Sequence, residues 1–224
     1  MGGTLLSPHP SVGEIYAEVL LEHRIVARPE ILNEGFRKAW KASHRVPRIG
    51  LSEESERKWW REVVYQTVAE SCEGDRFEEV FDHLWVTFAE TRRWRLHEGA
   101  MEMLRELKTR GYRLGVISNW DNRLLGLLDG LAISPWMESV VISSQVGFEK
   151  PDPRIFQAAL SQFRLEPRQM LHVGDSDYHD IEPARRIGWK TLKIENGPAS
   201  RNREDCISTL HEILVLLPSD PMRT

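Results

Sequence analysis

Three carboxylates stand close together at the end of an apolar run. The segment Leu171 to Asp180 reads LHVGDSDYHD, and Asp175, Asp177 and Asp180 lie within six residues of one another. In α/β proteins, ligand sites lie at the carboxyl ends of parallel strands, and grouped carboxylate oxygens suit Mg²⁺. The segment therefore predicts a Mg²⁺ site, although a surface turn or a helix N-cap explains any single Asp here equally well.

Two other segments supply groups that bind phosphate. The strand-like run YRLGVISN ends in the hydroxyl of Ser118 and the amide of Asn119. In GFEKPDPRIF, Pro151 keeps Lys150 out of helix and in an extended or turn conformation. Ser118 can donate to phosphate oxygens, and Lys150 can neutralise their charge. Together with Mg²⁺ at Asp175, these groups predict a phosphate site.

The order of these motifs resembles the haloacid dehalogenase-like (HAD) hydrolase superfamily, in the subfamily with a helical cap inserted after the first core strand. Its second motif is similar to VISN with Ser118, and its third to Lys150 followed by PDPRIF. Its fourth motif is similar to GDSDYHD with Asp175 and Asp180. The resemblance covers nearly the whole chain, and the tryptophan-rich segment KWWREVVYQT resembles the rhythmically-expressed-gene-2-like branch.

The resemblance implies a Mg²⁺-dependent phosphatase that acts on a small phosphorylated metabolite through an aspartyl-phosphate intermediate. It implies catalytic roles for Lys150 and Ser118. The implied phosphate- or substrate-binding residues are Thr4, Ser118, Asn119, Lys150 and Trp120. The implied Mg²⁺ ligands are the main-chain carbonyl of Gly2 and the carboxylates of Asp175 and Asp180, although Asp180 could instead orient Lys150 or hold a metal-bound water.

The first motif is where this chain departs from the family. The family pattern is D-x-D-G-T-L, with a nucleophilic Asp first and an acid/base Asp second, whereas this chain opens MGGTLLSP. Aligning the two puts Gly2 at the acid/base position and the nucleophile one residue before Met1. The first core strand, which lies in the centre of the family's sheet, is then missing too, and each buried backbone group left unpaired would cost about 1–3 kcal/mol.

We therefore expect the native protein to continue upstream with an apolar strand that ends in Asp, and we expect the chain as given to be inactive. The alternative is a genuine short form that binds phosphate without catalysis.

Hydrolytic dehalogenation of a 2-haloacid is the alternative chemistry. It uses the same nucleophile and Lys but no metal, and Gly2 suits it because a halide leaving group needs no proton. The carboxylates around Asp175 argue against it, because without Mg²⁺ they would repel an anionic substrate.

Composition narrows the class of protein. The chain has 224 residues and a formal net charge of −4, without the basic patch of a nucleic-acid-binding protein. Cys72 and Cys206 are far apart and lack C-x-x-C spacing, so neither a disulfide framework nor a zinc site is expected. No apolar run approaches the ~20 residues of a membrane span. We expect a cytoplasmic enzyme, a monomer or homodimer, whose partner is a small phosphorylated molecule and neither nucleic acid nor a membrane.

The pattern of apolar residues divides the chain into three parts. Residues 1–8 are the start of the core, residues 9–92 are a helical cap, and residues 93–224 are an α/β core with a Rossmann-like parallel sheet. Apolar spacing predicts cap helices over Ser11–His23, Arg28–Ser43, Ser52–Glu70 and Arg76–Thr91. Core helices are predicted over Glu98–Arg110, Arg123–Leu128, Asp152–Phe163 and Asp180–Ile187. Core strands are predicted over Arg113–Ser118, Ser139–Ser143, Met170–Gly174 and Thr191–Ile194. Arg45 and Arg48, between two cap helices, are expected to be solvated.

Four aromatic side chains need separate interpretation. His172 precedes the acidic cluster and is expected to be a packed core histidine, and His179 is expected to face solvent from a loop. Trp59 and Trp60 are consecutive on a helix, so their side chains point in directions about 100° apart around the helix axis. One of them is expected to pack within the cap, and the other could contact the core or line the substrate entrance.

Overall fold

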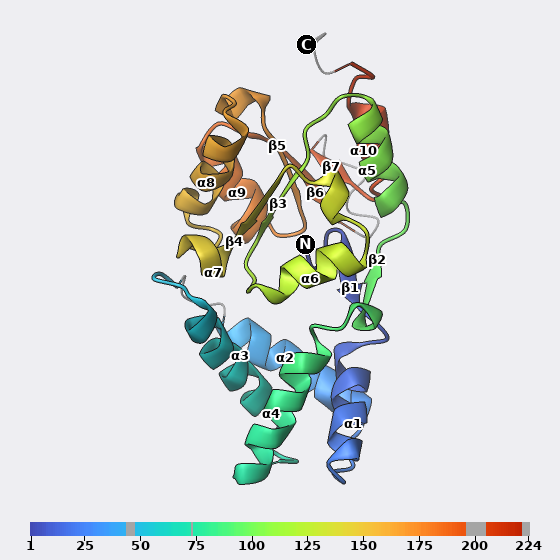
Figure 1. Cartoon of the computed structure of the whole chain (residues 1–224), viewed down its shortest axis with the longest axis vertical. Coiled ribbons are helices and arrows are strands. Elements are labelled where there is room, and N and C mark those ends of the chain that lie inside the picture. The colour runs from blue at the N-terminus through green and yellow to red at the C-terminus, as the bar shows by residue number, and fades with distance from the viewer. Residues whose placement is uncertain (44–47, 73, 196–204, 221–224) are drawn as a thin grey trace.

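The computed structural model describes residues 1–43, 48–72, 74–195 and 205–220 and has two parts (Figure 1). One part contains the helices α1 (Val12–Glu22), α2 (Pro29–Ser43), α3 (Glu53–Val68) and α4 (Asp75–Thr87). These helices confirm the four predicted cap helices, with ends that differ by about one turn or less. The chain enters this helical part after β1 (Leu6–Pro8) and leaves it at β2 (Trp94–Leu96). These two strands pair with each other in antiparallel register. The proposed boundaries at residues 8/9 and 92/93 both lie at this two-stranded ribbon.

The N-terminus of α3 illustrates how local sequence forms these helices. The hydroxyl of Ser52 accepts a hydrogen bond from the backbone N–H of Ser55, and the hydroxyl of Ser55 accepts one from the backbone N–H of Ser52. This reciprocal capping satisfies backbone donors that a helix start would otherwise leave unpaired. Ser52 is therefore the N-cap of α3. Further along α3, Val64 and Val68 are buried in the apolar interior of the helical part, where α3 packs against α2 and α4.

The other part contains strands and helices in alternation. Its strands are β3 (Gly115–Ser118), β4 (Ser139–Ile142), β5 (Leu171–Gly174), β6 (Lys190–Ile194) and β7 (Cys206–Ile207). Its helices are α5 (Ala100–Thr109), α6 (Arg123–Gly130), α7 (Ser143–Val146), α8 (Pro153–Phe163), α9 (Glu182–Arg186) and α10 (Glu212–Leu216), with short 3₁₀ turns at Thr91–Arg93, Ser134–Trp136 and Pro167–Gln169. The pairs β3–β4, β5–β6 and β6–β7 are all parallel, which confirms the predicted α/β class. In Figure 1, α7, α8 and α9 lie on one side of the strands, and α5, α6 and α10 lie on the other.

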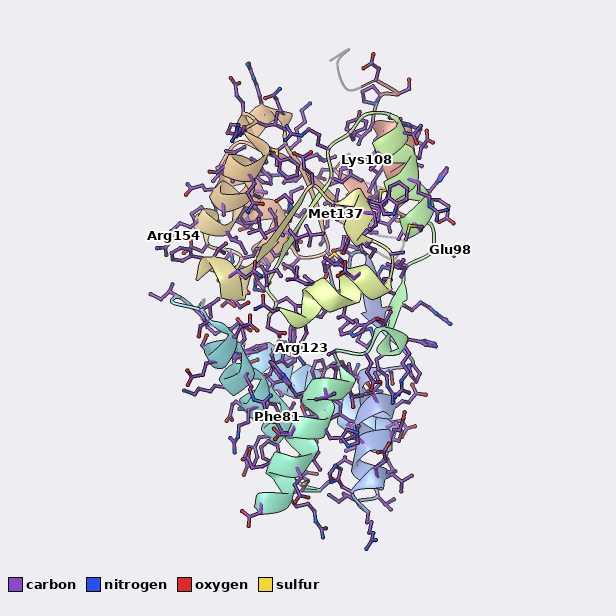
Figure 2. All side chains as sticks on the ribbon, in the orientation of Figure 1. Phe81, Glu98, Lys108, Arg123, Met137 and Arg154 are labelled. Carbon is purple, nitrogen blue, oxygen red and sulfur yellow. The ribbon has the colours of Figure 1, made fainter. Side chains whose placement is uncertain are left out.

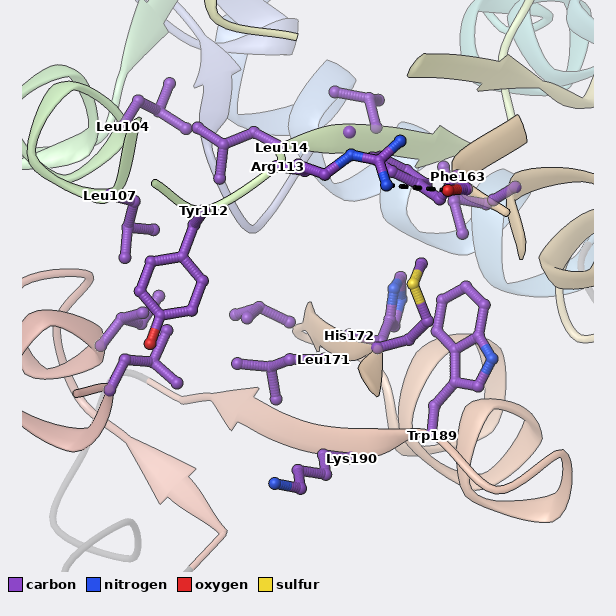
Figure 3. A pocket seen from close by; sticks show the side chains of 18 of the residues that line it. Leu104, Leu107, Tyr112, Arg113, Leu114, Phe163, Leu171, His172, Trp189 and Lys190 are labelled. Atoms are coloured by element: carbon purple, nitrogen blue, oxygen red, sulfur yellow. Dashed lines mark hydrogen bonds between the residues drawn. The ribbon is translucent and has the colours of Figure 1, made fainter. Parts of the chain in front are cut away.

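The parallel strands do not form one sheet. Within the described residues, β3 pairs only with β4 and β5 pairs only with β6, so two sheets face each other across a gap. A cavity of about 960 Å³ occupies this gap, and residues of both edges line it, among them Val116, Leu171 and Val173, with Met1 also lining it. Figure 3 shows the apolar side chains of Leu114 and Leu171 facing this cavity from its two sides. Within the described residues, no strand pairs with the facing edges of β3 and β5, and a strand between them stays a prediction.

The helix predicted over Asp180–Ile187 is present as α9 (Glu182–Arg186), but it begins two residues later than predicted. A π-helical turn spans Asp177–Ile181, and α9 follows it. The hydroxyl of Ser176 accepts a hydrogen bond from the backbone N–H of His179 and caps the turn. The wide turn leaves Asp180 buried instead of at an exposed helix start, and π turns of this kind often occur at functional sites.

Within the described residues, neither Cys72 nor Cys206 forms a disulfide. Within the described ranges, no helix has both the length and the apolar character needed to cross a membrane.

Candidate active site

Lys150 and Asp180 form a buried ion pair at the carboxyl ends of the parallel strands. The Lys150 ammonium donates to Oδ1 of Asp180 at 2.6 Å, and His172 Nε2 donates to the same oxygen at 3.0 Å. The backbone N–H of Ser176 donates to Oδ2 of Asp180 at 3.2 Å. Both carboxylate oxygens are therefore engaged by the protein. This arrangement fixes the position of the Lys150 ammonium, which favours the orienting role of Asp180 over direct metal ligation.

The protonation states of this cluster follow from burial and charge. Burial alone would raise the pKa of Asp180, but the Lys150 ammonium and the His172 hydrogen bond hold that pKa well below its usual value. Burial lowers the pKa of His172, although its hydrogen bond to Asp180 opposes this. The cluster therefore contains a carboxylate, an ammonium and a neutral imidazole. His172 also packs against the rings of Phe156 and Trp189, which confirms its prediction as a core histidine.

Asn119 holds the backbone of Lys150 in place. Its side-chain N–H donates to the Lys150 carbonyl at 2.9 Å, and its side-chain carbonyl accepts from the Lys150 N–H at 2.7 Å. This reciprocal pair joins the loop after β3 to the loop before α8. Both polar atoms of the Asn119 side chain contact Lys150, so a contact with phosphate stays a prediction.

Ser118 is a buried residue, with 3% of its surface exposed, and its hydroxyl makes no hydrogen bond to any described residue. Ser118 and Lys150 line the same cavity, of about 530 Å³, between the two parts of the molecule. A hydroxyl and an ammonium that line one cavity suit an anionic group with several oxygens.

Asp175 lies against the turn at the start of the chain. Its Oδ1 accepts a hydrogen bond from the hydroxyl of Thr4 at 2.9 Å. Gly3 has φ of +80°, and a Cβ atom on it would lie 2.5 Å from Oδ2 of Asp175. Only glycine leaves space for the carboxylate at this position. The predicted site residues Gly2, Thr4 and Asp175 are thus neighbours, and the Thr4 hydroxyl contacts Asp175.

The oxygen atoms around Asp175 fit a Mg²⁺ ion. The Gly2 carbonyl accepts no hydrogen bond from the described residues, and the Asp175 side chain is exposed. Mg²⁺ typically uses one or two protein carboxylates and keeps several waters, so a short oxygen-only ligand set is sufficient. Within the described ranges, no group of three or more His, Cys, Asp or Glu side chains is arranged to hold a metal. A Mg²⁺ ion would therefore rest on Asp175, the Gly2 carbonyl, water and substrate.

The α-amino group of Met1 is buried beside the same cluster. Burial and the nearby Lys150 ammonium lower its pKa to about 5, while Asp180 and Asp175 oppose this shift. The first residue of the chain therefore lies close to Lys150, Asp175 and Asp180.

Aromatic side chains of the helical part cover the site. The cavity of about 530 Å³ is lined by nine aromatic residues, namely Tyr16, Phe36, Trp40, Trp60, Phe81, Trp85, Phe88, Trp94 and Trp120. Trp60 lines the cavity and also packs against the apolar interior of the helical part. Trp59 instead lies under the guanidinium of Arg48, 4.4 Å from the ring centroid.

Sequence reasoning missed several residues of this site. Arg123 lies where α6 meets the helical part (Figure 2), and its guanidinium is 3.4 Å from the ring centroid of Trp85 and bonded to Asp121. His179 lines the cavity and is half-buried, so its prediction as a solvent-facing residue is wrong. Arg48 was expected to be solvated but forms ion pairs with Glu56 and Glu149, and Arg45 lies outside the described residues.

Comparisons with known proteins show the family and the fold of the chain. A family model described as haloacid dehalogenase-like hydrolase matches residues 1–188. The chain is 40% identical to human haloacid dehalogenase-like hydrolase domain-containing protein 3 over 195 residues, which are 85% of this chain and 78% of that protein. It is 30% identical to the rhythmically expressed gene 2 protein of Drosophila melanogaster over 205 residues, covering 85% of this chain and 79% of that one. The fold matches the crystal structure of a HAD phosphatase from Thermococcus onnurineus with a TM-score of 0.69 and 19% identity, over 99% of this chain and 96% of that chain.

Proposed function

Because the chain belongs to the haloacid dehalogenase-like hydrolase family, we propose that it provides the phosphate and Mg²⁺ site of a phosphatase that acts on a small phosphate monoester. The observation that carries this proposal is the buried Lys150 ammonium, held by Asp180 at 2.6 Å, in the cavity that Ser118 also lines. The solved structure of similar fold from Thermococcus onnurineus is described as a phosphatase, which supports the same chemistry.

Each side chain has a defined task in this proposal. Ser118 donates a hydrogen bond to the phosphoryl group, and Lys150 neutralises charge on it and on the attacking carboxylate. Asp175 and the Gly2 carbonyl hold Mg²⁺, which when bound supplies further charge neutralisation. Asp180, His172 and Asn119 keep Lys150 in place.

The nucleophilic carboxylate is proposed to come from a strand that fills the 960 Å³ cavity and ends directly before Met1. Three observations support this: the facing edges of β3 and β5, the apolar lining between them, and the buried position of Met1 beside Lys150. Its oxygen would attack phosphorus to form an aspartyl-phosphate, and water would then hydrolyse that ester. The chain as given would bind phosphate esters without turnover.

The test is to join an apolar strand that ends in Asp directly to Met1, with the same strand ending in Asn as the matched control. Both extensions should raise the thermal midpoint of unfolding, because both fill the cavity. Only the Asp extension should hydrolyse p-nitrophenyl phosphate in a Mg²⁺-dependent way. Equal activity of the two extensions, or the same activity in the unextended chain, would show that the nucleophile lies elsewhere. An unchanged midpoint for both would show that the cavity does not accept the strand.

A phosphate-binding protein without catalysis is the second candidate. It is favoured by the glycine at position 2, where the family motif has its acid/base residue. Dehalogenation of a 2-haloacid is less well supported, because the exposed Asp175 carboxylate would repel an anionic substrate in the absence of Mg²⁺.

A further inference from the structure

A row of aromatic rings runs from the phosphate site into the helical part. Its members, in order, are Trp120, Trp94, Phe88, Tyr16, Phe36 and Trp40. Successive ring centroids are 5.0 to 6.3 Å apart, and all six side chains line the 530 Å³ cavity. The row starts two residues after Ser118, so an apolar surface begins directly beside the group that would bind phosphate.

The charges that line this cavity are grouped at one end or are already paired. Lys150, Asp175 and Asp180 lie at the phosphate end. The guanidinium of Arg123 donates to both carboxylate oxygens of Asp121, at 2.7 and 2.8 Å. The aromatic end therefore has no unpaired charge among the described lining residues. A sugar or another polyol placed there would leave most of its hydroxyls without partners.

Tyr16 gives the aromatic end one neutral polar group. It is 1% exposed, and its hydroxyl makes no hydrogen bond to a described residue. Burial raises its pKa, so the phenol stays neutral and can donate one hydrogen bond. One phenol in a row of rings suits an aromatic ligand that carries few polar atoms.

Gly2 faces the same row. A Cβ atom on Gly2 would lie 3.8 Å from Cζ3 of Trp120, so an indole ring stands beside the position where the family motif has its acid/base carboxylate. The leaving oxygen would thus receive no proton from a side chain at position 2. Without general acid catalysis, the rate at which an aliphatic alcohol leaves would fall by a factor of about 10²–10⁴. A phenol has a pKa of about 10 and leaves as the anion far more readily.

We infer that this site selects aryl phosphates, the phosphate monoesters of aromatic alcohols, and this inference rests on the function proposed above. The aromatic row holds the leaving group by stacking while Ser118 and Lys150 hold the phosphoryl group. When the carboxylate oxygen forms its bond to phosphorus, the bond between phosphorus and the aryl oxygen breaks. The electron pair stays on that oxygen as phenolate, which takes a proton from water.

Binding to the unextended chain tests the inference without turnover. Dissociation constants are measured by titration calorimetry with Mg²⁺ for 2-naphthyl phosphate, glycerol 1-phosphate and inorganic phosphate. We expect 2-naphthyl phosphate to bind at least about tenfold more tightly than glycerol 1-phosphate, because each aromatic contact contributes a factor of about two to ten. Trp40→Leu and Phe36→Leu should each reduce this preference by about two- to tenfold. Trp136→Leu, a tryptophan outside the cavity, should leave the preference unchanged.

The outcomes separate this inference from the proposed function. If 2-naphthyl phosphate and glycerol 1-phosphate bind equally, the inference is wrong and the phosphate site stands. If tight binding of 2-naphthyl phosphate survives both Trp40→Leu and Phe36→Leu in folded protein, the aromatic group binds elsewhere and the inference is again wrong. If none of the three compounds binds, the proposed function fails, and the inference with it.

The Asp-extended protein gives a kinetic test of the leaving group. Its kcat/KM for substituted phenyl phosphates should fall steeply as the pKa of the phenol rises, because no side chain at position 2 donates a proton. A flat dependence would reveal a proton donor and would contradict the role given to Gly2.

Discussion

Arg48 holds both carboxylate oxygens of Glu149, the residue that directly precedes Lys150. Its Nε and Nη2 donate at 3.3 and 2.6 Å, and its backbone N–H donates to the same carboxylate at 2.7 Å. The same guanidinium lies 3.2 Å from Oε1 of Glu56 on α3. Ile49 also forms an antiparallel bridge with Phe148. The helical part is thus fastened to the loop that presents the lysine of the phosphate site.

Glu56 should make this junction sensitive to pH. Burial raises the pKa of Glu56 to about 7; Arg48 opposes the shift, and Glu149 and Asp121 add to it. Between pH ~4.5 and ~7 the Glu56 carboxyl keeps its proton in the folded protein and releases it in the unfolded chain. The stability contributed by the raised pKa of Glu56 is therefore complete below pH ~4.5 and is lost as the pH rises through ~7.

Glu56→Gln should therefore be more stable than the parent at pH 8, by about 1–3 kcal/mol, with little difference at pH 5. Urea unfolding at the two pH values measures this. Glu54→Gln is the control, because Glu54 lies in the same helical turn but pairs with Lys58 at the surface. A loss of stability in Glu56→Gln at pH 8 would mean that the ionised pair with Arg48 outweighs burial.

Asp180→Asn should destabilise the fold strongly. The substitution leaves the buried Lys150 ammonium without its counter-charge, which typically costs about 3–5 kcal/mol. Asp177→Asn is a matched control from the same π-helical turn, since Asp177 pairs with Lys193 at a half-exposed position and should contribute less than about 1 kcal/mol. Chemical denaturation compares the two variants, and similar losses would contradict the structural role given to Asp180.

Lys150→Arg should remove most turnover from the Asp-extended protein. The lysine is 7% exposed, and its ammonium fits as a compact charge against Asp180, whereas a guanidinium is a larger planar fork. We expect kcat to fall by about 10²-fold or more. Lys193→Arg, at the ion pair with the half-exposed Asp177, is the control and should retain activity. Near-normal activity of Lys150→Arg would show that the lysine is a loop residue without a role in turnover.

The positions of the phosphate-binding groups were accessible from sequence because each follows a short apolar strand. Ser118 is the last residue of β3 and Asp175 comes directly after β5, and in a parallel sheet such strand ends meet at one edge. The π turn was not accessible, because nothing in the local pattern shows that Asp180 turns inward to Lys150. The contact between Arg48 and Glu149 joins residues 101 positions apart, which helical periodicity does not encode.

The aromatic row could not be predicted from the sequence for a related reason. Helical spacing identifies an apolar face, but it does not distinguish side chains that fill the interior from those that border a cavity. Phe77 and Phe36 both lie on apolar faces, yet only Phe36 lines the cavity between the two parts.

Asp175→Asn should abolish the stabilisation of the chain by Mg²⁺. The Asp175 carboxylate is exposed and lies against Gly3, the residue that follows Gly2, whereas Asp177 is engaged by Lys193. We expect the rise in thermal midpoint on adding Mg²⁺ to disappear in Asp175→Asn and to persist in Asp177→Asn, since binding to the folded state alone produces that rise. Equal effects of the two substitutions would show that Asp175 is not the Mg²⁺ ligand.

Gly3→Ala should disturb the Mg²⁺ site without removing any ligand. At φ of +80° any side chain is strained, by about 1–2 kcal/mol. The new Cβ would also lie 2.5 Å from Oδ2 of Asp175, so the carboxylate must rotate and lose its hydrogen bond from Thr4. Gly99→Ala is the matched control, because Gly99 has φ of +74° and nothing within 4 Å of the added atom. Both variants should lose similar stability to backbone strain, but only Gly3→Ala should lose the Mg²⁺-dependent rise in thermal midpoint. If Gly3→Ala keeps that rise in full, the carboxylate does not need its observed position to bind the ion, and the metal site must be built differently.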